Sequence, residues 1–156
     1  MEAVIGPSVP ITTGQNCFRF LVPTEMARAN PITHKFVTEV SIETMEAFAA
    51  PDHRMVIYPC RNGELLNFVA IHPAKESSEA GESSWLTNGS VLELQRVYKE
   101  FGPTMREFCK MAEDVKLWEL STRAPISTFF EGKVVLVGDA AHPTLPRMYL
   151  LLFTCY

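Results

Sequence analysis

The sequence lacks the motifs and charge patterns that identify several common classes of protein. No Gly-x-Gly-x-x-Gly follows a run of strand-forming residues, so the loop that cradles the phosphates of a dinucleotide is missing from these 156 residues. Lysine and arginine are not clustered and the formal net charge is -4, whereas nucleic-acid binding depends on clustered cations. The apolar runs fall well short of the roughly 20 residues that a membrane-spanning helix needs. We therefore expect neither a nucleic-acid partner nor a membrane span.

Cysteine and histidine are too few and too dispersed to suggest a disulfide framework or a zinc site. The four cysteines are far apart in the chain, at Cys17, Cys60, Cys109 and Cys155. No Cys-x-x-Cys pair is present and no histidine lies at zinc-ligand spacing. His34 and His53 stand in polar surroundings and are interpreted as surface histidines. We expect reduced thiols, no metal ion and a cytoplasmic location.

The most informative stretch is a strand-like run followed by Gly and Asp, within residues 132–146. Val134–Val137 is apolar and mostly β-branched, which predicts a strand buried on both faces. Gly138 and Asp139 form the exit at its carboxyl end, where ligands of open α/β sheets bind. The Asp139 carboxylate can accept hydrogen bonds from a chain of hydroxyls, and the small Ala140 leaves room for a flat group. This geometry suggests a nucleotide cofactor; the alternative is a buried strand whose Asp139 only caps a turn.

A second strand is predicted over residues 15–22, where the side chains alternate between two faces. Phe18, Phe20 and Val22 share the apolar face. Arg19 lies on the other face and has two interpretations. It is either a charge on an edge strand that reaches solvent, or a guanidinium that faces a substrate cavity and holds a carboxylate through two parallel hydrogen bonds.

A β-hairpin is predicted next, because Met55–Cys60 and Leu65–His72 flank the pair Asn62-Gly63. Asn-Gly readily adopts the left-handed conformations of a two-residue turn. Pro59 has no N–H to complete a ladder pair, so we expect an edge position or a bulge near it.

Helices are predicted in two parts of the chain. A short helix is expected at Thr24–Ala29 and another at Ser41–Ala50, which Pro51 ends. Capping boxes, in which Ser or Thr is followed three residues later by Glu, predict two further helices that begin at Ser90 and Thr104. Their apolar positions recur at helical spacing and are interpreted as core.

The stretch Val-Val-Leu-Val-Gly-Asp-Ala-Ala-His-Pro-Thr-Leu-Pro, residues 134–146, resembles the second flavin-contacting motif of the FAD-dependent aromatic-ring hydroxylases. Within that family the chain is most similar to the salicylate hydroxylase-like monooxygenases. Residues 17–23 and 56–64 share the resemblance, and residues 115–131 do so more loosely. It therefore covers most of residues 12–146.

The resemblance implies an enzyme that binds FAD, consumes NADPH or NADH, and hydroxylates a small aromatic substrate. It implies that Asp139 binds the ribityl hydroxyls of FAD and that Gly138 and Ala140 permit close approach. Pro146 would lie beside the isoalloxazine ring. For His142 the resemblance leaves two roles open, a histidine bonded to local backbone or a proton-transfer group.

Two residues are implied as catalytic by the same resemblance. Arg19 would face the substrate cavity, and the Tyr58 hydroxyl would point at the substrate or the flavin ring. The alternative for Tyr58 is an aromatic side chain half-buried on a sheet face. Trp118 and Arg123 are further candidates for the cavity wall, although packing explains them equally well.

The expected fold is α+β, a mixed and largely antiparallel sheet with helices on one face, plus a remnant of a flavin-binding α/β domain. We divide the chain into a lead-in loop at 1–14, a substrate domain at 15–131, a flavin-domain strand with the Gly-Asp motif at 132–146, and an atypical tail at 147–156. The four sheet strands are expected near 15–22, 54–60, 64–72 and 115–120.

Past residue 146 the resemblance ends, because the bulky tail replaces the Gly-rich helix of the family. We therefore expect an incomplete chain that by itself binds FAD weakly or not at all. The alternative function is a non-catalytic fragment that binds a hydrophobic ligand or a partner without flavin.

The tail generates the first prediction. Tyr149–Phe153 is an uncharged apolar run without Pro, the signature of a segment that recruits other chains. We expect self-association through this end, so deleting residues 147–156 should raise the monomeric fraction in light scattering at equal concentration. If the deletion variant is no more monomeric, or is less soluble, the tail packs into the protein's own core.

Overall fold

The computed structural model describes residues 10–39, 44–77 and 87–141. Two compact units make up the chain: residues 14–119 form the larger, and residues 1–13 together with 120–156 form the smaller. The larger unit contains nearly all of the sheet and the four α-helices of the described residues.

The main sheet is built from six strands, of which every pair with a defined register is antiparallel. In chain order they are β1 (Ile11–Pro23), β2 (Glu46–Ala50), β3 (His53–Cys60), β4 (Leu65–Pro73), β5 (Thr87–Asn88) and β6 (Glu113–Thr122). In space the order is β2-β3-β4-β1-β6-β5. The four predicted sheet strands are all present, and the expected α+β class with a largely antiparallel sheet is confirmed.

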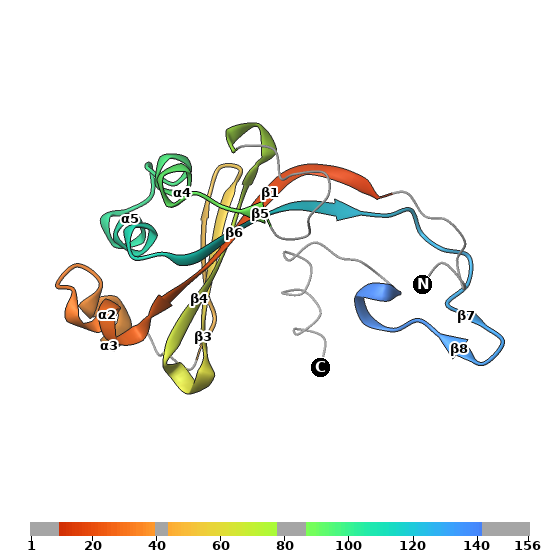
Figure 1. The fold of residues 1–156 in the computed structure, drawn as a ribbon, viewed down its shortest axis with the longest axis horizontal. Helices are drawn as coiled ribbons and strands as arrows, with labels where there is room; N and C mark the ends of the chain where they lie inside the picture. The colour runs from red at the N-terminus through yellow and green to blue at the C-terminus, as the bar shows by residue number, and fades with distance from the viewer. Residues whose placement is uncertain (1–9, 40–43, 78–86, 142–156) are drawn as a thin grey trace. The chain divides into compact units, whose positions relative to one another are not determined.

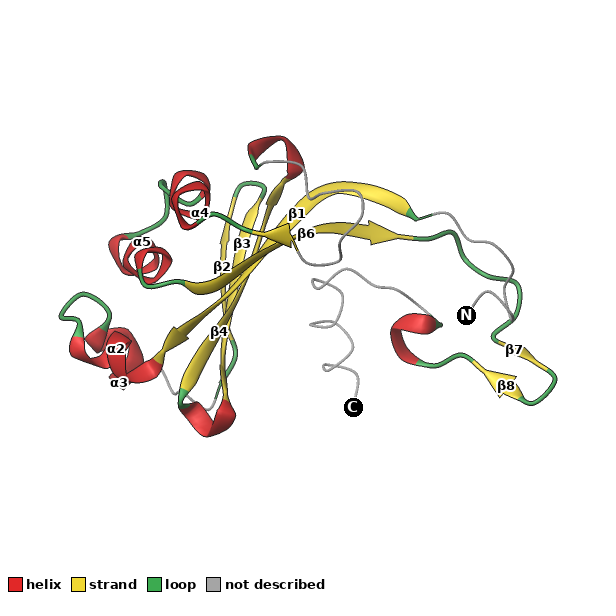
Figure 2. Ribbon diagram, viewed as in Figure 1, coloured by secondary structure: helices red, strands yellow, loops and turns green. Residues whose placement is uncertain are grey.

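The helices of the larger unit all lie on one side of this sheet (Figure 1; Figure 2). They are α2 (Thr24–Ala29), α3 (His34–Glu39), α4 (Val91–Val97) and α5 (Pro103–Lys110). The described residues also form three short 3-10 turns: η1 (Arg61–Gly63), η2 (Ala74–Glu76) and η3 (Gly138–Ala140). The predicted helix at Thr24–Ala29 is confirmed, as is the helical nature of the segment that follows Ser90.

The core fills the space between the sheet and these helices. Phe20 on β1 pairs with Phe68 on β4, and their rings stack with centroids 4.6 Å apart. Phe108 of α5 packs against Phe68 at 5.0 Å, which ties the helix layer to the middle of the sheet. Phe18, Phe20 and Val22 are all fully buried, as their alternation predicts. Truncating such a Phe to Ala costs about 3–5 kcal/mol, so this layer dominates the stability of the unit.

The predicted helix over Ser41–Ala50 is wrong where the structure describes it. Glu46–Ala50 is the edge strand β2, and the helix of this region is α3, at His34–Glu39. β2 pairs with β3 through a tight turn in which Asp52 has a φ of 58°. The ring of Phe48 packs against Phe36 at 5.8 Å, so tertiary contacts override the helix preference of this Ala-rich segment.

The hairpin between β3 and β4 is confirmed, but its turn is longer than predicted. Cys60 pairs with Leu65, so the connection spans residues 61–64, which include the 3-10 turn η1. Arg61, Asn62 and Gly63 all have positive φ, so the left-handed backbone begins one residue before the Asn-Gly pair. Pro59 lies beyond the last residue of β3 that β2 pairs with, which agrees with the expected edge position.

Of the two predicted capping boxes, the one at Ser90 has its N-cap hydrogen bond. The Ser90 hydroxyl accepts a hydrogen bond from the backbone N–H of Glu93 at 3.4 Å, which begins α4. The box predicted at Thr104 is wrong, because α5 begins one residue earlier, at Pro103, after an N-cap Gly102 without a side-chain bond. Proline is favoured at the first helical position, where its missing N–H costs nothing.

The strand before the Gly-Asp motif is not buried on both faces as predicted. Within the described part of the smaller unit, β8 (Val134–Val135) pairs only with β7 (Phe130–Glu131). The exposed fractions are 58% for Val134, 62% for Val135 and 72% for Val137. A two-stranded hairpin has no second layer to cover its faces, so its β-branched residues remain in solvent.

A buried histidine in the core was not identified from the sequence. His72 on β4 faces the helices, and its ring stacks on Phe18 with centroids 4.7 Å apart. Burial lowers the pKa of His72 from 6.5 to about 4, because the imidazolium would lose its hydration. Nearby His53 lowers this pKa further, while the Ala70 backbone and the carboxylates of Glu76 and Glu93 oppose the shift.

His72 makes the free energy of unfolding depend on pH. In the unfolded chain the pKa returns to about 6.5, so below that pH the unfolded state binds a proton that the folded state does not. Stability contributed by neutral His72 is therefore lost as the pH falls from about 6.5 toward 4, by up to about 3 kcal/mol. Urea denaturation at pH 7.0 and 4.5 should show a smaller loss for His72→Phe than for the wild type.

The exposed His34 supplies the matched control for this measurement, since His34→Gln also removes one histidine but leaves the core unchanged. If His72→Phe loses as much stability on acidification as the wild type does, His72 is not the group responsible.

Candidate functional site

The face of the sheet opposite the helices carries the two predicted catalytic residues. Strand register places Tyr58 opposite Asn67 and Asn67 opposite Leu21, so these three side chains share a face. Arg19 pairs with Val69, two residues along β4 from Asn67, and therefore lies on that same face. The structure thus brings Arg19 and Tyr58 to one surface, with Asn67 on the strand between them.

Arg19 is exposed, yet two contacts hold its guanidinium in place. Its Nε–H donates to Asn67 Oδ1 at 3.0 Å, and its Cζ lies 5.8 Å from the centroid of the Trp118 ring on β6. Within the described residues the terminal nitrogens of Arg19 have no protein partner. A guanidinium held in this way can donate two parallel hydrogen bonds to a carboxylate.

Two donors on this side of the molecule are buried without a partner in the described part of the chain. Asn67 is 1% exposed, and its Nδ2 makes no hydrogen bond; Trp118 Nε1 is likewise buried and unpaired. Such groups are rare in folded proteins, because each costs about 1–3 kcal/mol of desolvation. They therefore mark this face as a place where an acceptor from a ligand or from water belongs.

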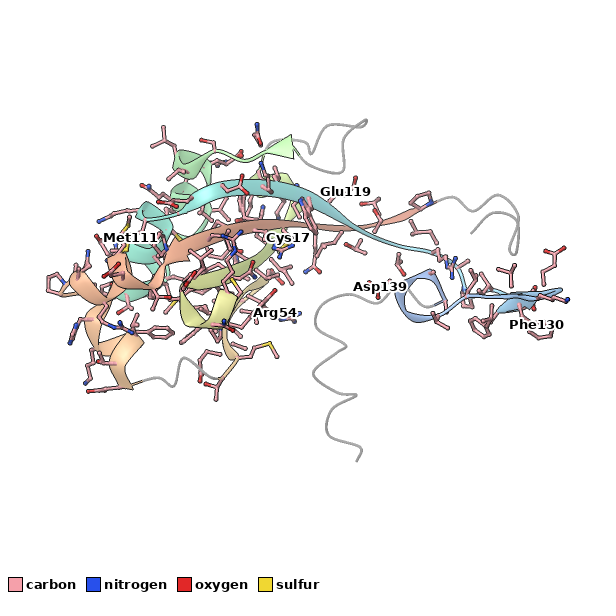
Figure 3. The ribbon with its side chains drawn as sticks, turned by 60° about the horizontal axis from the view of Figure 1, so that its bottom comes forward. Cys17, Arg54, Met111, Glu119, Phe130 and Asp139 are labelled. Atoms are coloured by element: carbon pink, nitrogen blue, oxygen red, sulfur yellow. The ribbon has the colours of Figure 1, made fainter. Side chains whose placement is uncertain are left out.

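Three of the predicted cofactor-binding residues form one turn of the smaller unit, η3 (Gly138–Ala140), and Figure 3 labels Asp139 on it. Gly138 has a φ of 58°, and a Cβ added there would meet no atom within 4 Å. Asp139 is exposed. Arg123 donates from Nη2 to the carbonyl oxygens of Ala140 at 2.6 Å and Ala141 at 2.7 Å, which holds the turn in shape. Pro146 and His142 lie outside the described residues.

The structure assigns different positions to two other residues considered from the sequence. Arg123 supports the turn through backbone carbonyls, whereas Trp118 lies beneath the Arg19 guanidinium. His53 is not a surface histidine as expected: it is half-buried, and its Nε2 lies 2.9 Å from Glu76 Oε2. His34 is exposed, as expected.

Asn67 is the site residue that the sequence reading missed. A signal was available, because the predicted hairpin register already places this polar residue opposite Tyr58, in a strand that is otherwise mostly apolar. The sequence alone could not show the hydrogen bond from Arg19 to Asn67, because the two residues are 48 positions apart in the chain.

The cysteines of the described residues are free thiols, and these residues form neither a metal site nor a membrane-spanning helix. Cys17, Cys60 and Cys109 are free thiols, and burial raises the pKa of both Cys17 and Cys109 to about 12, which keeps them protonated. Among the described residues, no group of three or more His, Cys, Asp or Glu side chains is arranged to hold a metal ion. None of the helices in this part of the chain has the length and apolar character to cross a membrane.

The chain is similar in sequence to several known proteins. No protein-family model matches the chain. It is 33% identical to the FAD-dependent monooxygenase phomE' of Diaporthe leptostromiformis, over 85% of this chain and 33% of that protein. It is 26% identical to salicylate hydroxylase of Pseudomonas putida, over 92% of this chain and 33% of that protein.

The fold agrees with these matches in sequence. The structure of a salicylate hydroxylase substrate complex superposes with a TM-score of 0.69 at 22% identity, over 89% of this chain and 34% of that one. The chain thus spans about a third of the length of the proteins it matches. Sequence and fold together show that the chain is homologous to FAD-dependent monooxygenases, salicylate hydroxylase among them, over the third of their length that it covers.

Proposed function

We propose that this chain forms the substrate-binding part of an FAD-dependent monooxygenase that hydroxylates a small aromatic acid and consumes NADPH or NADH. The observation that carries the proposal is the exposed Arg19, held by Asn67 and Trp118 on the face of the sheet that the helices leave open. Salicylate hydroxylase, one of the relatives, is named for an aromatic acid. A cytoplasmic location, in keeping with free thiols, is part of the proposal.

In this proposal Arg19 binds the carboxylate of the substrate and so fixes the orientation of the aromatic ring. The end of the guanidinium offers two parallel N–H donors to the two carboxylate oxygens, and its charge favours the ionised acid. Tyr58, half-buried on the same face, supplies a phenolic hydroxyl toward the ring or its substituents. These residues bind and orient; FAD, when bound, supplies the redox chemistry with oxygen.

The turn at Gly138–Ala140 suits the hydroxyl-bearing part of FAD. The positive φ of Gly138, and the open space where a Cβ would stand, allow a ligand to approach the backbone closely. The exposed Asp139 carboxylate is an acceptor for ribityl hydroxyls, and Ala140 adds little bulk. Pro146 keeps the role beside the flavin ring that the family resemblance implies.

The FAD role of Asp139 generates a prediction. The chain should be joined to the flavin-domain residues of P. putida salicylate hydroxylase that it does not match. Asp139→Ala in this chimera should weaken FAD binding about 10- to 100-fold, because hydrogen bonds to a charged group contribute about 1.5–3 kcal/mol. Quenching of flavin fluorescence measures the affinity.

Asp139→Asn is the matched control, since it keeps one acceptor oxygen and should lose less affinity than Asp139→Ala. If Asp139→Ala binds FAD as tightly as the unmodified chimera does, Asp139 does not contact the cofactor.

The substrate role of Arg19 generates a second prediction for the same chimera. Arg19→Ala should raise the KM for salicylate about 10- to 100-fold with a smaller change in kcat, because it removes charge-assisted hydrogen bonds worth about 1.5–3 kcal/mol. Oxidation of NADPH or NADH and formation of hydroxylated product are measured together. Arg19→Lys keeps the charge without the planar fork and should give an intermediate KM.

An unchanged KM in Arg19→Ala would contradict the proposed substrate role. If the unmodified chimera binds FAD but forms no hydroxylated product from any aromatic acid tested, the proposed reaction is wrong.

A further inference from the structure

Asn67 occupies an unusual position for a polar residue. It lies on β4, which is flanked by β3 and β1 in the sheet, and its side chain is 1% exposed. Its Oδ1 accepts from Arg19 Nε at 3.0 Å, while its Nδ2 has no protein partner among the described residues. An apolar side chain of similar size would avoid the desolvation cost of that unpaired donor, so packing alone does not account for an amide here.

The hydrogen bond that the Asn67 side chain accepts from Arg19 decides how the guanidinium of Arg19 is presented. A guanidinium can bind a carboxylate either through its side, with Nε and one Nη, or through its end, with both Nη atoms. Because Oδ1 of Asn67 occupies Nε, the side edge is blocked and the end remains open.

Trp118 restricts the remaining freedom of Arg19. In the sheet, β1 lies between β4 and β6, so Asn67 and Trp118 hold the guanidinium from the two neighbouring strands. The amide bonds it in its plane, and the indole lies 5.8 Å from Cζ. Two contacts of different kinds thus fix both the position and the direction of the charge.

We infer that Asn67 is the positioning residue that aims Arg19 end-on, and that through Arg19 it makes the site select carboxylates over carboxamides. The inference rests on the proposed function, since it concerns the same substrate site. A carboxylate gives each Nη donor an acceptor oxygen, whereas a carboxamide turns an NH2 toward one of them and leaves that donor unpaired. A guanidinium free to rotate can instead meet the amide oxygen through a single N–H. Fixing the orientation of Arg19 therefore increases the preference for a carboxylate over a carboxamide.

The test measures ligand binding by the full chain in a Trp85→Phe background, where Trp118 is the one remaining tryptophan. Benzoate and benzamide are titrated, and quenching of Trp118 emission beneath Arg19 gives each Kd. Benzoate should bind more tightly than benzamide. Arg19→Ala should remove that preference, and Asn67→Ala should weaken benzoate binding about tenfold with benzamide unchanged.

Two comparisons separate aiming from a structural role. Arg19→Ala combined with Asn67→Ala should be no weaker for benzoate than Arg19→Ala alone, because residues that act as one unit are not additive. Val69→Ala is the matched control: Val69 faces Arg19 across the β1–β4 pair, and its truncation should leave the benzoate to benzamide ratio as in the wild type.

A second readout does not depend on ligand. The Nε–H of Arg19 should exchange with water several-fold faster in Asn67→Ser than in the wild type, measured by NMR, because the shorter side chain cannot reach it. This variant also replaces Asn67→Ala in the titrations if the latter does not fold.

The outcomes distinguish the two claims. If Arg19→Ala abolishes the preference for benzoate but Asn67→Ala retains it, or loses both ligands equally, the inference about Asn67 is overturned and the proposed function stands. If the wild type shows no preference, or Arg19→Ala keeps it, the proposed carboxylate site is overturned.

Discussion

The antiparallel register between β1 and β4 is the constraint on which the rest of the larger unit depends. It pairs Phe20 with Phe68 and Arg19 with Val69, and so assigns each residue of both strands to one face of the sheet. A slip of one residue would turn Arg19 into the core and move Phe20 to the open face. The stacked Phe20 and Phe68 rings, capped by Phe108 of α5, make that slip costly.

The two faces set by this register have different chemistry. On the helix side, burial is nearly complete and apolar, with His72 kept neutral by the same packing. On the open side, Asn67 and Trp118 present buried donors beside an exposed guanidinium. The apolar face contributes the stability that offsets the cost of unpaired polar groups on the other, which is how a small sheet can carry a polar site.

The smaller unit follows a different principle. Its hairpin β7–β8 exposes Phe130, Val134 and Val135, and nothing in the described residues covers them. Polar contacts with the backbone are present in it, among them the bonds from Arg123 to the carbonyls of Ala140 and Ala141. Arg123 and the positive φ of Gly138 thus both contribute to the shape of the Gly-Asp turn.

Local pattern determined a large part of this protein. Alternation with period two assigned Phe18, Phe20 and Val22 to the core face and Arg19 to the other, because neighbouring side chains of a strand point in opposite directions. The Asn-Gly pair located the hairpin, Ser90 located the start of a helix, and the motif at 134–146 indicated the family.

Tertiary structure alone decided the rest. Glu46–Ala50 is a strand because β3 offers it an edge, and Val134, Val135 and Val137 stay exposed because no described element covers them. The depressed pKa of His72 and the bond from Arg19 to Asn67 both depend on neighbours that chain folding brings together from distant positions. Periodicity and capping depend on residues a few positions apart in the sequence. The burial, the charge state and the orientation of a side chain depend instead on which segments pack together.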